Sequence, residues 1–271
     1  MKKRFARSII RSLPPSKLLA LYWLLPCEVR KLIYKTIMYQ DYREHQLMRN
    51  TMVRNNSLEP FDDYKCIFVH VPKTAGVSIG KSLFGNLGGN HMTIDHYQLV
   101  FSRNEFKNYF KFAFVRNPWD RLVSAYHFMK AGGFGADDEK WVEDNLAEYQ
   151  NFDGFVKGWL NRKNIQSPGS AIHFLPQFKF VCTKDNIPMV DFIGYFENLE
   201  EDVAYIRDRI GISGQALLFL NKTESRRQDY RSYYTEETKR IVEDVYREDV
   251  QIFGYDFENK SFCRQLAGRC S

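Results

Sequence analysis

Four short apolar runs along the chain predict buried strands. Apolar runs of this length, bounded by polar or turn-forming residues, are typical of strands that are covered on both faces. The first run ends at Pro72 and the second ends at Arg116. The predicted strands are residues 66–71, 112–115, 178–182 and 190–194.

Segments with helix-start signals lie between and after these strands. Asn117 is a predicted N-cap with Pro118 at the first helical position, and Thr235 is predicted to cap a long helix that has Glu236 and Glu237 in its first turn. The predicted helices are residues 77–83, 95–103, 117–126, 138–149, 152–160, 197–210 and 235–253. Strands that alternate with helices predict an α/β fold, with a P-loop-like parallel β-sheet flanked by helices.

The N-terminal part of the chain has a different character. We expect residues 1–60 to be a helical, basic extension and residues 61–271 to be the main domain. The apolar run at residues 18–26 is too short to span a bilayer. Basic residues precede it as in a signal peptide, but Pro14 and Pro15 interrupt the segment and no small-residue cleavage site follows. A helix on the inner membrane surface and a helix packed on the domain both fit.

Charge and cysteine content narrow the possible partners. A net charge of +6 over 271 residues favours an anionic ligand or an anionic membrane surface. It is too small and too dispersed for a nucleic-acid-binding protein, in which basic residues form a stripe. The five cysteines show no metal-ligand spacing, so we expect no metal and a reducing, cytoplasmic location. Cys263 and Cys270 allow one disulfide, but free thiols fit that location better.

The loop at residues 72–78 follows the first predicted strand and opens a helix, a common arrangement for binding phosphate. Backbone N–H groups at a helix start favour an anion, and Gly76 lets the backbone approach it closely. Thr74 and Ser78 add hydroxyl donors, and the Lys73 ammonium can neutralise a phosphate oxygen. From the loop alone, an ordinary strand–turn–helix with a solvated lysine fits equally well.

An overlapping pattern supplies an alternative function. Ala75-x4-Gly80-Lys81-Ser82 fits a loose form of the nucleoside-triphosphate loop, which would make the protein a P-loop kinase that uses Lys81 and acts on a small molecule or a sugar. Two features disfavour it. The Gly-Lys-Ser lies late relative to the strand end, and the next strand ends in Arg116, where such enzymes have the Asp that holds magnesium.

A second anion site is predicted one strand away. Arg116 stands at the carboxyl end of its strand, on the side of the sheet where the loop also lies. A guanidinium group binds phosphate through two parallel hydrogen bonds, and Ser124 on the following helix can donate to the same group. Pairing of Arg116 with Asp120 is the alternative. Two anion sites on adjacent strands predict a ligand with phosphates at two separate positions.

Together, HVPKTAGVS at residues 70–78 and FVRNPWDRLVSAY at residues 114–126 resemble the sulfotransferases that use 3′-phosphoadenosine-5′-phosphosulfate (PAPS). The resemblance is to the carbohydrate branch, with the heparan 2-O and chondroitin enzymes and their bacterial relatives, and it covers residues 65–257. It implies that the first segment holds the 5′-phosphosulfate and the second holds the 3′-phosphate. The donor-binding residues implied are Pro72, Lys73, Thr74, Ala75, Gly76, Val77, Ser78, Arg116 and Ser124, with Lys222 and Thr223 near the adenine or the 3′-phosphate. The family usually has Thr in place of Val77, so one hydroxyl is lost here.

The resemblance also implies a reaction. The sulfuryl group of PAPS would pass in line to a hydroxyl of a glycan or glycolipid, without a metal, and 3′,5′-adenosine diphosphate would be released. Lys73 and the loop amides would stabilise charge on the leaving phosphate. We expect His91 to be the general base, because a histidine titrates near neutral pH and His91 lies between the two anion motifs. His96 is the second choice. We expect His70 to be structural and His173 to be a weak candidate for the acceptor groove.

Overall fold

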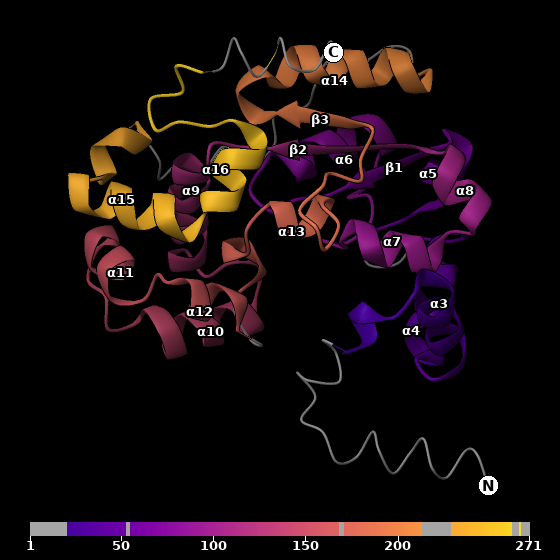
Figure 1. Cartoon of the computed structure of the whole chain (residues 1–271), viewed down its shortest axis with the longest axis horizontal. Coiled ribbons are helices and arrows are strands. Elements are labelled where there is room, and N and C mark those ends of the chain that lie inside the picture. The colour runs from indigo at the N-terminus through magenta and orange to yellow at the C-terminus, as the bar shows by residue number, and fades with distance from the viewer. Residues whose placement is uncertain (1–20, 53–54, 168–170, 213–228, 262–265, 267–271) are drawn as a thin grey trace, which may run out of the picture.

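The computed structural model describes residues 21–52, 55–167, 171–212, 229–261 and 266 (Figure 1). Its centre is a parallel sheet with the strand order β1 (Cys66–Val69), β2 (Phe110–Val115) and β3 (Phe192–Tyr195). Phe112 in the central strand pairs with Phe68 on one side and with Phe192 on the other. Burial of β2 between two strands and two helical layers accounts for its continuous apolar run. The predicted α/β fold with a parallel sheet flanked by helices is confirmed.

One predicted strand is wrong. The apolar run at residues 178–182 forms a short helix, α13 (Phe178–Val181). The carboxylate of Asp249 accepts hydrogen bonds from the backbone N–H groups of Gln177 and Phe178, at 2.8 Å each. These donors lie at the helix start, so a residue about 70 positions further along the chain supplies the cap. A short buried run has no periodicity that separates a strand from a helix, and the sequence pattern could not reveal this distant contact.

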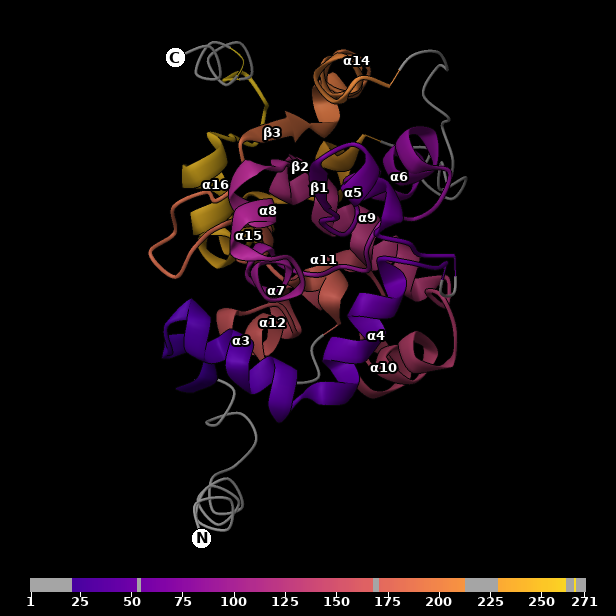
Figure 2. The same ribbon diagram turned by 90° about the vertical axis from the view of Figure 1, so that its right-hand side faces the viewer.

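Helices cover both faces of the sheet. α14 (Leu199–Ile210) lies along β3 at one end of the molecule, whereas α7 (Ile94–Val100) lies on the opposite side of the sheet (Figures 1 and 2). The predicted helix at residues 95–103 ends early because Ser102 starts a new helix through a capping box with Glu105. The helices that complete this half are α5 (Glu59–Asp63), α6 (Gly76–Phe84) and α8 (Arg103–Asn108).

A second hydrophobic core lies beyond the carboxyl ends of the strands (Figure 1). It is built on α9 (Pro118–Lys130), which starts as predicted: the Asn117 side chain accepts from the Trp119 N–H at 3.1 Å, and Pro118 takes the first position. The other helices of this half are α10 (Ala136–Leu146), α11 (Phe152–Gly158), α12 (Arg162–Gln166), α15 (Glu236–Val245) and α16 (Arg247–Phe253), with 3₁₀ turns at Ile172–Phe174 and Tyr230–Tyr233.

The long helix predicted at residues 235–253 is two helices. Thr235 caps α15 as predicted, but the chain leaves helical geometry at Tyr246, where φ is −107° and ψ is 29°. The Tyr246 hydroxyl donates to the carbonyl of Phe174 at 2.8 Å. The break turns α16 back toward the sheet, which carries Asp249 to the start of α13.

The first described helices, α3 (Cys27–Thr36) and α4 (Tyr39–Met48), pack on α7. Their buried side chains are Arg30, Tyr34 and Met48, and Arg30 lies 3.5 Å from the carboxylate of Asp95 at the start of α7. Residues 27–48 therefore pack on the domain as helices. Within the described ranges, no helix is both long enough and apolar enough to cross a bilayer.

Candidate active site at the carboxyl end of the sheet

The loop between β1 and α6 turns through two residues in the left-handed region. Lys73 has a φ of 68° and Ala75 has a φ of 66°, and the Thr74 hydroxyl donates to the carbonyl of Val71 at 2.9 Å. Ala75 is the N-cap of α6, so the N–H groups of the first helical turn, which have no partner within the helix, adjoin the loop. Turns of this kind gather N–H groups into a concave anion site. The loop conformation thus suits the phosphate site predicted at residues 72–78.

Two arginines hold the carbonyl groups of this loop. Arg121 donates from Nε to the carbonyl of Pro72 at 3.0 Å, and Arg116 donates from Nη1 to the carbonyl of Lys73 at 3.2 Å. In a trans peptide the N–H points away from the carbonyl. The N–H groups of Lys73 and Thr74 therefore point away from these arginines, toward the side where an anion would approach.

Gly76 is required by a neighbouring side chain. A Cβ atom at this position would lie 1.9 Å from Cδ2 and 2.0 Å from Nε2 of His70, whose ring is buried and stacks on Phe68. Close approach of the backbone to a ligand was the predicted reason for this glycine. The structure adds a second reason, which is that the imidazole of His70 packs directly under the loop.

The Lys73 side chain extends into a buried, cationic environment. Its Nζ lies 3.7 Å from the ring centroid of Phe128 on α9. Burial, with further contributions from the nearby charges of Arg116 and Arg121, lowers the pKa of Lys73 to about 7, and Asp138 opposes the shift. The surroundings of Lys73 therefore disfavour its charged form near neutral pH. A bound anion would supply the missing counter-charge and stabilise the ammonium.

Three contacts orient the guanidinium group of Arg116. Its Nε donates to Oδ2 of Asp120 at 2.8 Å, so the predicted alternative pairing is present, and its guanidinium stacks 3.9 Å from the ring centroid of Phe196. With the bond to Lys73, two of its five N–H groups have partners among the described residues. Ser124 lies four residues beyond Asp120, on the same face of α9.

The backbone of Arg116 is clamped by a fully buried glutamine. Gln177 accepts from the Arg116 N–H at 2.9 Å and donates from Nε2 to the Arg116 carbonyl at 2.8 Å. Asp249 in turn holds the N–H of Gln177. Burial raises the pKa of Asp249 to about 6. The position of Arg116 thus depends on a chain of contacts that runs back to α16.

His91 lies beside the loop as a neutral, oriented imidazole. Its Nδ1 is 2.9 Å from the carbonyl oxygen of His70. Since a carbonyl oxygen only accepts, Nδ1 must carry the proton, and Nε2 of the neutral ring then has a free lone pair. Burial lowers the pKa of His91, and the charges of Arg121 and Lys73 add to this effect. The ring is therefore ready to accept a proton at neutral pH.

His173 packs beside His91 and Phe128. Its ring centroid is 6.1 Å from that of His91 and 4.7 Å from that of Phe128. Burial lowers its pKa to about 3, so the ring is neutral beside Asp138, whose carboxylate lies 3.9 Å away. Its buried Nδ1 has no hydrogen-bond partner in the described part of the chain.

Other predicted residues lie elsewhere. His96 faces the segment that precedes α3: its Nδ1 is 2.7 Å from the Thr93 hydroxyl, and its ring packs edge-on against Trp23. Lys81 lies in the last turn of α6, away from the start of the helix where a triphosphate would bind. Lys222 and Thr223 lie outside the described residues. Across the described ranges, no cluster of His, Cys, Asp and Glu could hold a metal ion.

The sequence interpretation missed Arg121, Gln177 and Asp249. Arg121 stands within the segment at residues 114–126 that carries the family resemblance, but neither Arg121 nor Gln177 has a distinct signal of its own in the sequence. Asp249 had one: it lies on the apolar face of its helix, three residues after Tyr246 and four before Phe253, where a carboxylate must have a buried partner.

The comparisons agree with the motifs. The family model described as "Sulfotransferase family" matches residues 60–256. Carbohydrate sulfotransferase 14 of Danio rerio is 27% identical over 263 residues, which covers 80% of this chain and 67% of that protein. Carbohydrate sulfotransferase 11 of Mus musculus is 23% identical over 237 residues, with coverage of 73% and 66%. An uncharacterized protein of Archaeoglobus fulgidus is 32% identical over 110 residues, with coverage of 40% and 72%. The chain thus spans about two thirds of the length of the two animal relatives. No solved structure matches.

The contact between Gly76 and His70 can be tested with a double-mutant cycle. Gly76→Ala is expected to lower the free energy of unfolding by about 1–3 kcal/mol, because the new methyl group overlaps the buried imidazole. His70→Ala makes room for it, so the double variant should lose clearly less than the sum of the two single losses. Urea denaturation of the four proteins gives the values, and strict additivity would contradict the contact.

The low pKa of Lys73 predicts proton uptake on anion binding. An anion at Nζ raises this pKa, so binding of 3′,5′-adenosine diphosphate should be tightest below pH 7 and weaken by up to about tenfold per pH unit above it. Calorimetry between pH 7 and 9, where the phosphates keep their charge, measures this slope. Lys73→Met should abolish the slope and Lys81→Met should retain it. A slope that survives Lys73→Met would show that another group titrates.

Proposed function

Because the chain belongs to the sulfotransferase family, we propose that it transfers the sulfuryl group of PAPS to a hydroxyl of a carbohydrate, either a glycan or a glycolipid. One observation carries the proposal: the bond from Arg116 to the Lys73 carbonyl joins two cationic side chains at the carboxyl ends of adjacent strands. The names of the Danio rerio and Mus musculus relatives support the acceptor class.

The two ends of the donor would bind on the two strands. The N–H groups of the loop at residues 72–78 and the Lys73 ammonium would hold the 5′-phosphosulfate. The remaining N–H groups of Arg116, with the hydroxyl of Ser124, would hold the 3′-phosphate. Val77 still offers its backbone N–H where the family usually has Thr. Lys222 and Thr223 stay predicted neighbours of the nucleotide.

The proposed reaction is an in-line displacement at sulfur. The acceptor oxygen forms a bond to sulfur while the bond between sulfur and the 5′-phosphate oxygen breaks, and the products are the sulfate ester and 3′,5′-adenosine diphosphate. The acceptor proton passes to Nε2 of His91, which the His70 carbonyl keeps free by holding Nδ1–H. The charge of Lys73 would stabilise the phosphate oxygen as negative charge develops.

The proposal predicts that substitution of His91 slows turnover without weakening nucleotide binding. His91→Ala should lower kcat by about 10²–10⁴-fold, because the general base is lost, while the Kd for 3′,5′-adenosine diphosphate changes little. The assay is transfer of labelled sulfuryl from PAPS to a panel of glycans and glycolipids, with His96→Ala as the matched control that should keep full turnover.

Two results would contradict this account at different levels. Near-normal turnover of His91→Ala would refute the assignment of the base alone. A protein that transfers no sulfuryl group to any acceptor, and that 3′,5′-adenosine diphosphate does not protect against thermal unfolding, would refute the proposed function as a whole.

A further inference from the structure

Phe134, in the loop between α9 and α10, is the most exposed large hydrophobic residue in the described part of the chain. It is 73% exposed, and no other large hydrophobic residue among the described ones between Tyr64 and Ile187 is exposed. A single exposed ring is normal on a protein surface. What distinguishes Phe134 is its connection to the candidate active site.

A chain of ring contacts makes this connection. The ring of Phe134 packs edge-on against Phe128, with the centroids 4.9 Å apart. Phe128 in turn lies 3.7 Å from Nζ of Lys73 and 4.7 Å from the ring of His173. The ring of His173 is 6.1 Å from that of His91. Two rings therefore lie between the exposed phenylalanine and the proposed base.

The backbone that presents Phe134 is held by Asp138 of α10. Oδ2 of Asp138 accepts a hydrogen bond from the Phe134 N–H at 2.9 Å. Gly133 has a φ of 62°, and a Cβ atom at this position would lie 2.4 Å from Cβ of Asp138. Only glycine combines this conformation with such a close approach. The loop thus rests on the Asp138 side chain, whose Oδ2 is also 3.9 Å from Nε2 of His173.

The surroundings of the exposed ring are acidic. Asp137, Asp138 and Glu139 form the first turn of α10, and a Cβ atom on Gly132 would lie 3.7 Å from Oε1 of Glu139. Carboxylate oxygens accept hydrogen bonds from hydroxyl groups, whereas they repel a second carboxylate. The rim of the loop therefore favours a ligand that is uncharged and rich in hydroxyl groups.

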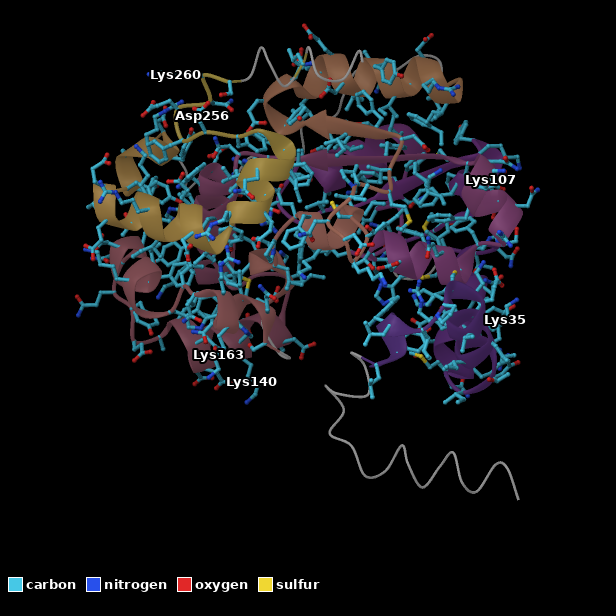
Figure 3. The ribbon with its side chains drawn as sticks, viewed as in Figure 1. Lys35, Lys107, Lys140, Lys163, Asp256 and Lys260 are labelled. Atoms are coloured by element: carbon cyan, nitrogen blue, oxygen red, sulfur yellow. The ribbon has the colours of Figure 1, made fainter. Side chains whose placement is uncertain are left out.

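The basic residues that flank the loop in the sequence do not cancel this charge. Lys130, at the end of α9, donates from Nζ to the carbonyls of Leu146 and Tyr149. Lys140 projects outward at the lower edge of the molecule (Figure 3) and lies 3.9 Å from Asp144. It follows Asp138 by two residues, so it stands on the other side of the helix. Both ammonium groups are thus directed away from the exposed ring.

We propose that Phe134, supported by Phe128, is a platform on which an uncharged pyranose ring of the acceptor stacks. The C–H bonds on one face of such a sugar carry partial positive charge and match the negative face of an aromatic ring, while the hydroxyl groups at its edge meet the carboxylates of α10. A protein or lipid partner would need more apolar area than one ring provides. The inference rests on the proposed function, because it takes the sugar to be part of the acceptor.

NMR titration of the full chain, in the presence of 3′,5′-adenosine diphosphate, tests it with two probes. Methyl β-galactoside and methyl β-galacturonoside differ only in the uronate carboxylate, and the galactoside should bind about 2–5-fold more tightly. Phe134→Ala should weaken galactoside binding by about 3–10-fold, whereas Phe134→Trp should retain it. Tyr205→Ala is the matched control. Tyr205 is 49% exposed, stacks on Phe192 and lies on α14, at the opposite end of the molecule from α10 (Figures 1 and 2).

The acidic rim is tested by a second pair of variants. Asp138→Asn keeps an oxygen for the Phe134 N–H but removes the charge, so it should narrow the difference between the two glycosides. Asp144→Asn, on the same helix, should preserve that difference. The inference is overturned if Phe134→Ala binds the galactoside as the wild-type protein does, or if the uronide binds as tightly as the galactoside. It is also overturned if light scattering shows a dimer that Phe134→Ala dissociates.

The transfer assay separates failure of this inference from failure of the proposed function. Phe134→Ala should raise the KM for a glycan acceptor more than it lowers kcat, and the Kd for 3′,5′-adenosine diphosphate should not change. A protein that transfers sulfuryl groups with the same KM in Phe134→Ala refutes the platform alone. A wild-type protein that transfers none, yet binds the galactoside through Phe134, refutes the proposed function and with it the role of the sugar as acceptor.

Discussion

The hydrogen bond from Arg116 to the carbonyl of Lys73 is the contact on which the candidate site depends. It links the end of β2 to the loop after β1, and therefore sets the distance between the two cationic groups. Arg116 can make this bond because Asp120 and Phe196 hold its guanidinium and Gln177 holds its backbone. Charge-assisted bonds of this kind are stronger than neutral ones and fix direction as well as position.

The same arrangement creates an electrostatic conflict. Lys73, Arg116 and Arg121 lie close together in a buried region. Burial lowers the pKa of Lys73, and the charges of Arg116 and Arg121 lower it further. In the folded state the charged lysine is disfavoured relative to the unfolded chain, so this group destabilises the fold as pH falls from its usual pKa toward 7. A site of this kind gains most from a ligand with several negative charges, because the ligand relieves the conflict that the fold maintains.

Local signals predicted much of this fold and the candidate residues. The end of β2 before Arg116, the caps at Asn117 and Thr235, and the position of the loop before α6 all follow from neighbouring residues, and the structure agrees with them. β1 ends at Val69, two residues before the end of the predicted strand. The errors arose where distant residues decide. α13 is a helix because Asp249 caps it. The helix predicted at residues 235–253 is interrupted at Tyr246, whose hydroxyl donates a hydrogen bond to the carbonyl of Phe174. Likewise, the tautomer of His91 depends on a carbonyl 21 residues away, which no local pattern shows.

The central claim is that Arg116 binds one phosphate while the loop binds the other. Titration calorimetry with 3′,5′-adenosine diphosphate and 5′-adenosine monophosphate, on the wild-type protein and on Arg116→Ala, tests it most directly. The account predicts that the wild-type protein prefers the diphosphate by about 10–100-fold, the contribution of charged hydrogen bonds. Arg116→Ala should lose this preference while it still binds the monophosphate. An unchanged preference in Arg116→Ala would contradict the account, since the 3′-phosphate would then bind elsewhere.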